Sequence, residues 1–127
     1  MQNEIKRLPD AELEIMLIIW KANPPVSATY IMERLKIQRK WSLQTLFTVL
    51  TRLTEKGFLS CEKQGRSNLY HAIVEENAYK QLEGKSILER VYGDSFKNLV
   101  VSLIAGDAID KDDLAELRDY LNRLEEK

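Results

Sequence analysis

The chain of 127 residues is 44% hydrophobic and 31% charged, a composition typical of a globular protein with one domain or two small ones. Its longest apolar run, residues 15–20, is far too short to span a bilayer, and the N-terminus lacks the apolar segment of a signal peptide. These features argue against an integral membrane protein and predict a cytoplasmic location. Cys61 is the only cysteine, so no internal disulfide is expected.

The net charge of −1 hides an uneven distribution. Residues 1–75 hold 11 Lys and Arg against 8 Asp and Glu, a balance of +3, whereas residues 76–127 hold 8 against 12, a balance of −4. Basic residues are densest in the segment 36–66, where they are Lys36, Arg39, Lys40, Arg52, Lys56, Lys63 and Arg66. Such a patch suits phosphate contacts with nucleic acid, although an ordinary solvated surface has a similar composition.

Two helices are predicted before residue 36. The first begins at Ala11, with Asp10 as its N-cap, and ends at the prolines 24 and 25. Its core-facing positions follow the helical spacing i, i+3, i+4, i+7 and are Leu13, Met16, Leu17 and Trp20. Ser27 is predicted to cap the second helix, which extends to about Leu35.

The segment 41–57 predicts a third helix with two distinct faces. Ser42 is its N-cap, and Gly57 suits the left-handed conformation that often follows a helix end. The apolar face consists of Leu46, Leu50 and Leu53. Hydrogen-bonding side chains occupy another face and are Gln44, Thr45, Thr48 and Arg52. A helix that reads a DNA groove is expected to have this character.

After Gly57 the period changes from helix to strand. Residues 58–62 and 68–73 predict two strands, with Gly65 in the turn between them. A hairpin directly after a third helix predicts a winged helix-turn-helix domain, here residues 1–75. Lys63 and Arg66 then lie near the tip of the wing, where they suit phosphate contacts, although solvated turn residues are an alternative interpretation.

Residues 76–127 predict a second, helical domain. Gly84 weakens the first of its helices by about 1 kcal/mol relative to alanine, so a bend or break there is possible. A short apolar helix follows and ends at Gly106, and Asp110 caps the last helix. So small a segment cannot bury its apolar groups alone. We therefore expect dimerisation through Phe96, Leu99, Val100, Leu103, Leu114, Leu117, Leu121 and Leu124. Folding back onto the winged-helix core of the same chain is the alternative.

The sequence offers little for catalysis or metal binding. His71 is the only histidine, and two potential ligands, His71 and Cys61, do not make a closed metal site. We expect Cys61 to pack as a small apolar group. No nucleophile, base and orienting acid can be assembled around the single histidine. The sequence therefore predicts no enzyme, no metal and no cofactor.

Three motifs resemble those of the penicillinase repressor family, which includes BlaI, MecI and the copper-responsive CopY-type repressors. LPDAELEIM at residues 8–16, with Trp20, resembles the family's DAELEVM…W start, and residues 41–57 resemble WSxxTxxTxLxRLxxKG. Residues 65–70 are similar to GRxxxY. The resemblance covers nearly the whole chain and implies a homodimeric winged-helix repressor of resistance genes that binds a palindromic operator. Together with the helix faces and the wing, it gives the candidate DNA-binding residues Ser42, Gln44, Thr45, Phe47, Thr48, Arg52, Lys63 and Arg66.

Two departures from the family pattern bear on function. Many relatives carry a polar residue where this chain has Phe47, which either packs against the wing or a neighbouring helix or contacts a thymine methyl and shifts operator preference. The β-lactam-responsive relatives are inactivated by cleavage of an Asn-Phe bond in the dimerisation region, triggered by a membrane sensor-protease. The aligned residues here are Ser102 and Leu103, a possible cleavage site. Copper sensing is disfavoured because the C-terminal region lacks the paired cysteines of CopY-type relatives.

Three classes of function follow from these patterns. A dimeric DNA-binding repressor accounts for the most features, with release by proteolysis or by a different inducer left open. A winged-helix protein-interaction module is the alternative, and such a module would tolerate the loss of Lys63 and Arg66. An enzyme would need a site that the sequence does not provide.

Overall fold

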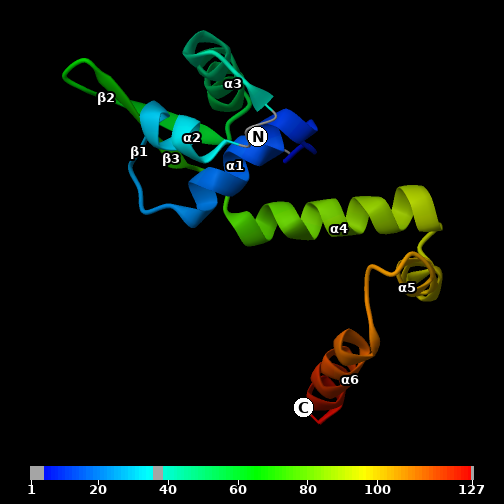
Figure 1. Cartoon of the computed structure of the whole chain (residues 1–127). Helices are drawn as coiled ribbons and strands as arrows, with labels where there is room; N and C mark the ends of the chain where they lie inside the picture. The colour runs from blue at the N-terminus through cyan, green and yellow to red at the C-terminus, as the bar shows by residue number, and fades with distance from the viewer. Residues whose placement is uncertain (1–4, 36–38, 127) are drawn as a thin grey trace. The chain divides into compact units, whose positions relative to one another are not determined.

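The computed structural model describes residues 5–35 and 39–126. Lys36, part of the predicted basic patch, lies outside the described residues. Helices dominate, and three strands make one small sheet. The elements in chain order are α1 (Asp10–Lys21), β1 (Val26–Ser27), α2 (Ala28–Arg34), α3 (Leu43–Glu55), β2 (Leu59–Gln64), β3 (Ser67–Ala72), α4 (Glu76–Tyr92), α5 (Phe96–Ala105) and α6 (Lys111–Glu125) (Figure 1).

The chain divides into two compact units, Met1–Glu83 and Gly84–Lys127. The first unit contains α1 to α3, the sheet and the first turns of α4. It extends beyond residue 75, the predicted end of the winged-helix domain, because Tyr79 of α4 is buried in the hydrophobic core.

Side-chain caps determine where α2 and α3 begin. The Ser27 hydroxyl accepts a hydrogen bond from the Tyr30 amide, and the Ser42 hydroxyl accepts one from the Thr45 amide, both at 3.1 Å. Both caps were predicted. Asp10, in contrast, is the first residue of α1 and caps nothing, because Pro9 occupies the N-cap position and its carbonyl accepts the first helical bond. The Asp10 charge still lies in the first turn, where it is favourable to the helix dipole.

The sheet is antiparallel, with the strand order β1-β3-β2. β2 and β3 form the predicted hairpin, which extends away from the helices (Figure 1). Gln64 pairs with Ser67, so Gly65 and Arg66 form a two-residue turn, and Gly65 has a φ of +61° that suits glycine. β1 is too short for periodicity to predict. It pairs Val26 with Tyr70 and thereby joins the start of α2 to the hairpin.

The core of the first unit lies between the helices and the sheet. The predicted apolar face of α3 is confirmed, since Leu46, Leu50 and Leu53 are each fully buried. The predicted face of α1 is partly wrong: Leu13, Leu17 and Trp20 are only partly buried. The buried positions of α1 are Glu12, Ile15, Met16 and Ile19. This helix is apolar on most sides after Leu13, so periodicity alone left the inward face ambiguous.

Tyr79 attaches the start of α4 to the first unit. Its hydroxyl accepts a hydrogen bond from the Leu8 amide at 2.7 Å and donates one to the Glu83 carboxylate at 2.6 Å. Its ring centre lies 5.7 Å from that of Trp20 and 5.8 Å from that of Phe58. Burial and the bond to Glu83 raise the pKa of Tyr79 to about 12.

The second unit has no buried core of its own among its described residues, 84–126. α4 extends from Glu76 to Tyr92, so Gly84 does not end the helix. Asp110 caps α6, as predicted, in a reciprocal capping box with Asp113. No helix in the described part of the chain is both long and apolar enough to cross a membrane.

We expect Tyr79→Phe to lower the free energy of unfolding by about 1–3 kcal/mol at pH 8, because the buried Leu8 amide loses its acceptor. The raised pKa of Tyr79 means that the folded state holds this proton more tightly than the unfolded state does. The stabilisation is therefore complete below pH 10 and is lost as the pH rises from 10 toward 12.

Urea unfolding followed by tryptophan fluorescence at pH 8 and pH 11 measures both effects. Both tryptophans, Trp20 and Trp41, lie in the first unit. The difference between wild type and Tyr79→Phe should narrow at pH 11, because only the wild type loses this contribution. An equal difference at both pH values would contradict the assigned proton linkage.

Candidate nucleic-acid interface

α3 presents one complete face to solvent. Gln44, Thr45, Thr48 and Arg52 are all exposed, as their spacing predicted. The opposite face is held in the core by the fully buried leucines. Because burial fixes the rotation of the helix about its axis, the exposed residues form a defined surface and not one of several alternatives.

The threonine hydroxyls on this face are directed at the helix backbone. Thr48 donates to the Gln44 carbonyl at 3.1 Å, and Thr51 donates to the Phe47 carbonyl at 2.9 Å. Each hydroxyl proton is therefore occupied. What these two side chains still offer a partner is an acceptor oxygen and a γ-methyl group.

Ser42 and Thr45 are tied together at the start of α3. Their hydroxyl oxygens lie 3.0 Å apart, in addition to the cap from the Thr45 amide to Ser42. Ser42 therefore serves the helix start directly. Any contact it makes with DNA would come from a hydroxyl already engaged within the chain.

Two cations of the predicted basic patch are paired with acids of α1. Lys56, which directly follows α3, forms an ion pair with the buried Glu12. Arg39, before α3, donates to the Glu14 carboxylate at 2.6 Å, and its guanidinium lies 5.5 Å from the Trp41 ring centre. Since these charges are balanced within the chain, the patch available for phosphates is smaller than composition suggested.

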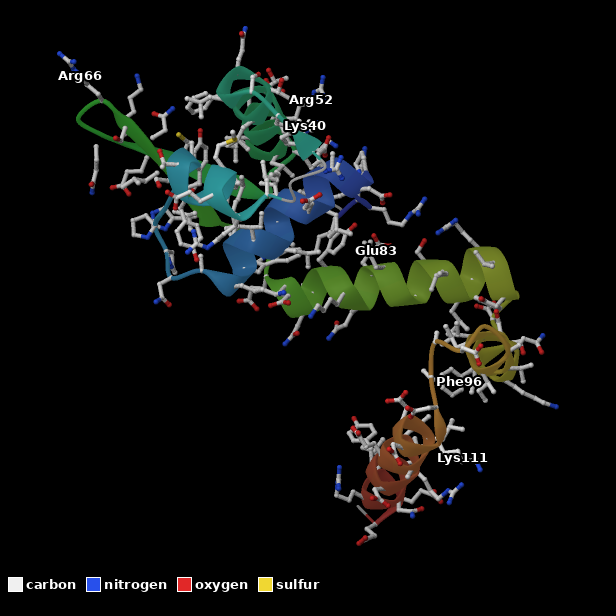
Figure 2. All side chains as sticks on the ribbon, in the orientation of Figure 1. Lys40, Arg52, Arg66, Glu83, Phe96 and Lys111 are labelled. Carbon is white, nitrogen blue, oxygen red and sulfur yellow. The ribbon has the colours of Figure 1, made fainter. Side chains whose placement is uncertain are left out.

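The other described cations of the predicted patch are exposed. Arg66 lies at the tip of the hairpin, and Arg52 lies on α3 (Figure 2). Lys40, Arg52, Lys63 and Arg66 are all exposed. Within residues 5–35 and 39–126, none of the four forms an ion pair with an acid. They are therefore available to a polyanion that contacts α3 and the wing.

Phe47 lies on the exposed side of α3. Its exposed fraction is 36%, and it is not part of the core or of the residues packed against it. This position gives no support to the interpretation that it packs against the wing or a neighbouring helix. Leu43, with 48% exposed, and Thr51, also exposed, share this side and were not among the candidate residues. The spacing 43, 47, 51 would have identified them.

The residues predicted for dimerisation all lie on α5 and α6 of the second unit. Phe96, Leu121 and Leu124 are exposed at 55%, 42% and 47%, and the others are partly buried. The Ser102–Leu103 bond lies within α5, where the Ser102 hydroxyl accepts a hydrogen bond from Tyr92 at 3.2 Å. The Ser102 carbonyl also accepts a hydrogen bond from the Gly106 amide at 3.0 Å.

The expectation that Cys61 packs as an apolar group is wrong, because Cys61 is exposed on β2. Cys61 lies on β2, an edge strand of the sheet, and its partner across the ladder is the buried Tyr70 of the central strand β3. Every residue of β2 after Leu59 is exposed, so its edge position leaves Cys61 uncovered. His71 approaches the Glu62 carboxylate at 3.3 Å. No group of three or more potential metal ligands occurs among the described residues.

The sequence and fold match known repressors. A family model described as penicillinase repressor matches residues 8–123. The chain is 35% identical over 123 residues to the methicillin resistance regulatory protein MecI of Mammaliicoccus sciuri, covering 97% of this chain and 99% of that protein. It is 30% identical over 118 residues to the penicillinase repressor of Bacillus licheniformis, covering 93% and 91%.

A solved structure of the DNA-binding domain of the repressor BlaI matches with a TM-score of 0.52 and 35% identity, covering 61% of this chain and 94% of that domain. This likeness, with the hairpin directly after α3, confirms the predicted winged-helix fold. The matched proteins are transcriptional repressors and not enzymes, as the sequence predicted. The chain belongs to the penicillinase repressor family.

Proposed function

We propose that the protein is a DNA-binding transcriptional repressor that acts as a homodimer on a palindromic operator. The observation that carries the proposal is the exposed polar face of α3, accompanied by the exposed cations Arg52, Lys63 and Arg66. The likeness to the DNA-binding domain of BlaI supports the same conclusion.

The dimensions and chemistry of α3 suit the major groove, which admits one α-helix. In this role Gln44, Thr45 and Thr48 lie near base edges, and Arg52 reaches a guanine or a phosphate. Lys63 and Arg66 of the wing contact phosphates, which position the protein without reading the sequence. The polar and cationic groups are thus divided between α3, which specifies, and the wing, which adds affinity.

Dimerisation is supported by the second unit. Its described residues include no buried side chain, although α5 and α6 carry a series of large apolar residues. Exposed apolar surface of this kind is a feature of interaction sites. A second copy of the chain supplies a matching surface, and two linked α3 helices reading adjacent half-sites gain affinity through multivalency.

Resistance-type genes are the proposed targets, because the matched relatives are a methicillin resistance regulator and a penicillinase repressor. We further propose that repression is relieved by cleavage at Ser102–Leu103, downstream of a membrane sensor-protease. Because this bond is helical, a protease can reach it only after α5 unwinds locally. Cleavage there removes α6 and with it part of the dimer surface.

Binding to its own promoter should weaken strongly as salt rises, with a slope of about 0.9 in log affinity per log salt for each phosphate contact. Arg66→Gln and Lys63→Gln should each reduce that slope and weaken binding to all duplexes alike. A mobility-shift titration at several salt concentrations measures both quantities. A protein-interaction module would show no such specific, salt-dependent complex.

Lys56 provides the matched control for this series. Changing Lys56 alone leaves the Glu12 carboxylate buried without a partner and destabilises the fold. The control therefore carries both changes, Glu12→Gln and Lys56→Gln, which neutralise the two charges together. We expect this double variant to keep the wild-type salt slope. A slope reduced as much as in Arg66→Gln would show that Lys56 contacts phosphate.

Leu121→Asp and Leu124→Asp should convert the dimer to monomer, because both side chains are exposed in the single chain and a charge at the interface is costly. Sedimentation velocity measures the change in mass. Affinity for a full palindrome should fall while affinity for a half-site is kept. Asp119→Asn, an exposed change on the same helix, is the control. A variant that remains dimeric would exclude α6 from the interface.

Cells exposed to a β-lactam should contain a fragment ending at Ser102, whereas untreated cells should contain only intact chain. Mass spectrometry of the purified protein from both cultures identifies the cut bond. Intact protein throughout induction, with derepression of the target genes, would exclude proteolysis as the release mechanism. A fragment with a different C-terminus would assign the cleavage to another bond.

A further inference from the structure

One flank of the exposed face of α3 is apolar. Leu43, Phe47 and Thr51 are spaced four residues apart, so their side chains follow one another along the helix surface. All three are exposed, Leu43 at 48% and Phe47 at 36%. We call these three residues the apolar strip. Large apolar side chains on a free helix surface are unfavourable in water unless a partner covers them.

Thr51 offers an apolar surface because its hydroxyl is engaged with the helix backbone. Its hydroxyl donates to the Phe47 carbonyl at 2.9 Å, which engages its proton with the backbone. The γ-methyl is the group that remains for an apolar contact. Thr48, on the neighbouring row, is arranged in the same way through the Gln44 carbonyl. The exposed face is therefore richer in methyl groups and poorer in free donors than its sequence suggests.

We propose that the apolar strip reads the C5-methyl groups of thymine in the major groove, with Leu43, Phe47 and Thr51 as specificity-determining residues. The inference rests on the proposed DNA-binding function. Among the four bases only thymine displays a methyl group in that groove. Charge favours DNA over an apolar protein partner, because Lys40 precedes α3 and the exposed Arg52 lies on it. Glu55 is the single acid in the helix.

Replacing thymine with uracil tests this directly, because it removes the methyl group and keeps every hydrogen-bonding group of the base. A binding site is first selected from a random duplex library with the full-length protein. Duplexes of the selected site with deoxyuridine at single positions are then titrated. We expect about a fourfold loss of affinity at each contacted thymine, equivalent to about 0.8 kcal/mol per buried methyl.

Matched variants assign each methyl to a side chain. Thr51→Ser removes the γ-methyl and keeps the hydroxyl, whereas Thr51→Val keeps methyl groups and removes the hydroxyl. The uracil penalty at the contacted position should disappear in Thr51→Ser and persist in Thr51→Val. Phe47→Ala and Leu43→Ala should each abolish the penalty at one further position. Repeating the selection with Phe47→Gln should change the preferred site.

The possible outcomes distinguish failure of this inference from failure of the proposed DNA-binding function. A selected site that binds equally well with uracil at every position overturns the inference and leaves the repressor function intact. An unchanged site preference in Phe47→Gln also counts against it. Failure to select any site overturns both. Deoxyuridine in the flanking sequence should not change the affinity. A loss of affinity there would show that uracil acts by altering the shape of the duplex and not by removing methyl contacts.

Discussion

The ion pair between Glu12 and Lys56 is the contact on which the arrangement of the first unit depends. Among the described residues, Glu12 is the one charged side chain that is buried. A buried carboxylate without a partner is strongly unfavourable, so α1 is acceptable in this orientation only when Lys56 is brought to it. Lys56 directly follows α3, and Gly57 then takes a φ of +86°. The pair therefore places the end of α3 against α1 at the point where the chain turns into the wing.

A second ion pair lies near the start of α3, the end opposite to Lys56. Glu14 of α1 accepts from Arg39, three residues before the Ser42 cap. Between these contacts the leucine face of α3 packs into the core. Ion pairs of this kind contribute little net stability compared with the leucines, but separating the buried Glu12 from Lys56 is costly, and this cost restricts sliding and rotation of α3. A DNA-reading helix needs that restriction, since base contacts fail when side chains are displaced by a fraction of a hydrogen-bond length.

Local signals in the sequence were sufficient for much of this fold. Serine caps, the glycine after α3, the leucine period and the Gly65 turn depend on neighbouring residues, and each was predictable. Contacts between distant residues were not. Glu12 and Lys56 are separated by 44 positions, so nothing local marks Glu12 as buried or Lys56 as paired. For the same reason the basic patch was overestimated, and β1, whose two residues are ordered by pairing with β3, was missed.

The candidate interface shows the same division between composition and geometry. Thr48 and Thr51 count as hydrogen-bonding residues in a sequence, yet in the helix their protons are held by the backbone. At these two positions, a surface that appears polar by composition offers methyl groups and acceptor oxygens. With one arginine and one glutamate in α3, little of the electrostatic affinity for DNA comes from this helix. In the proposed complex, affinity comes chiefly from the wing cations and from pairing two copies of the chain, which leaves α3 to discriminate between bases. The wing cations then hold every duplex alike, and the difference in affinity between sequences comes from the contacts of α3.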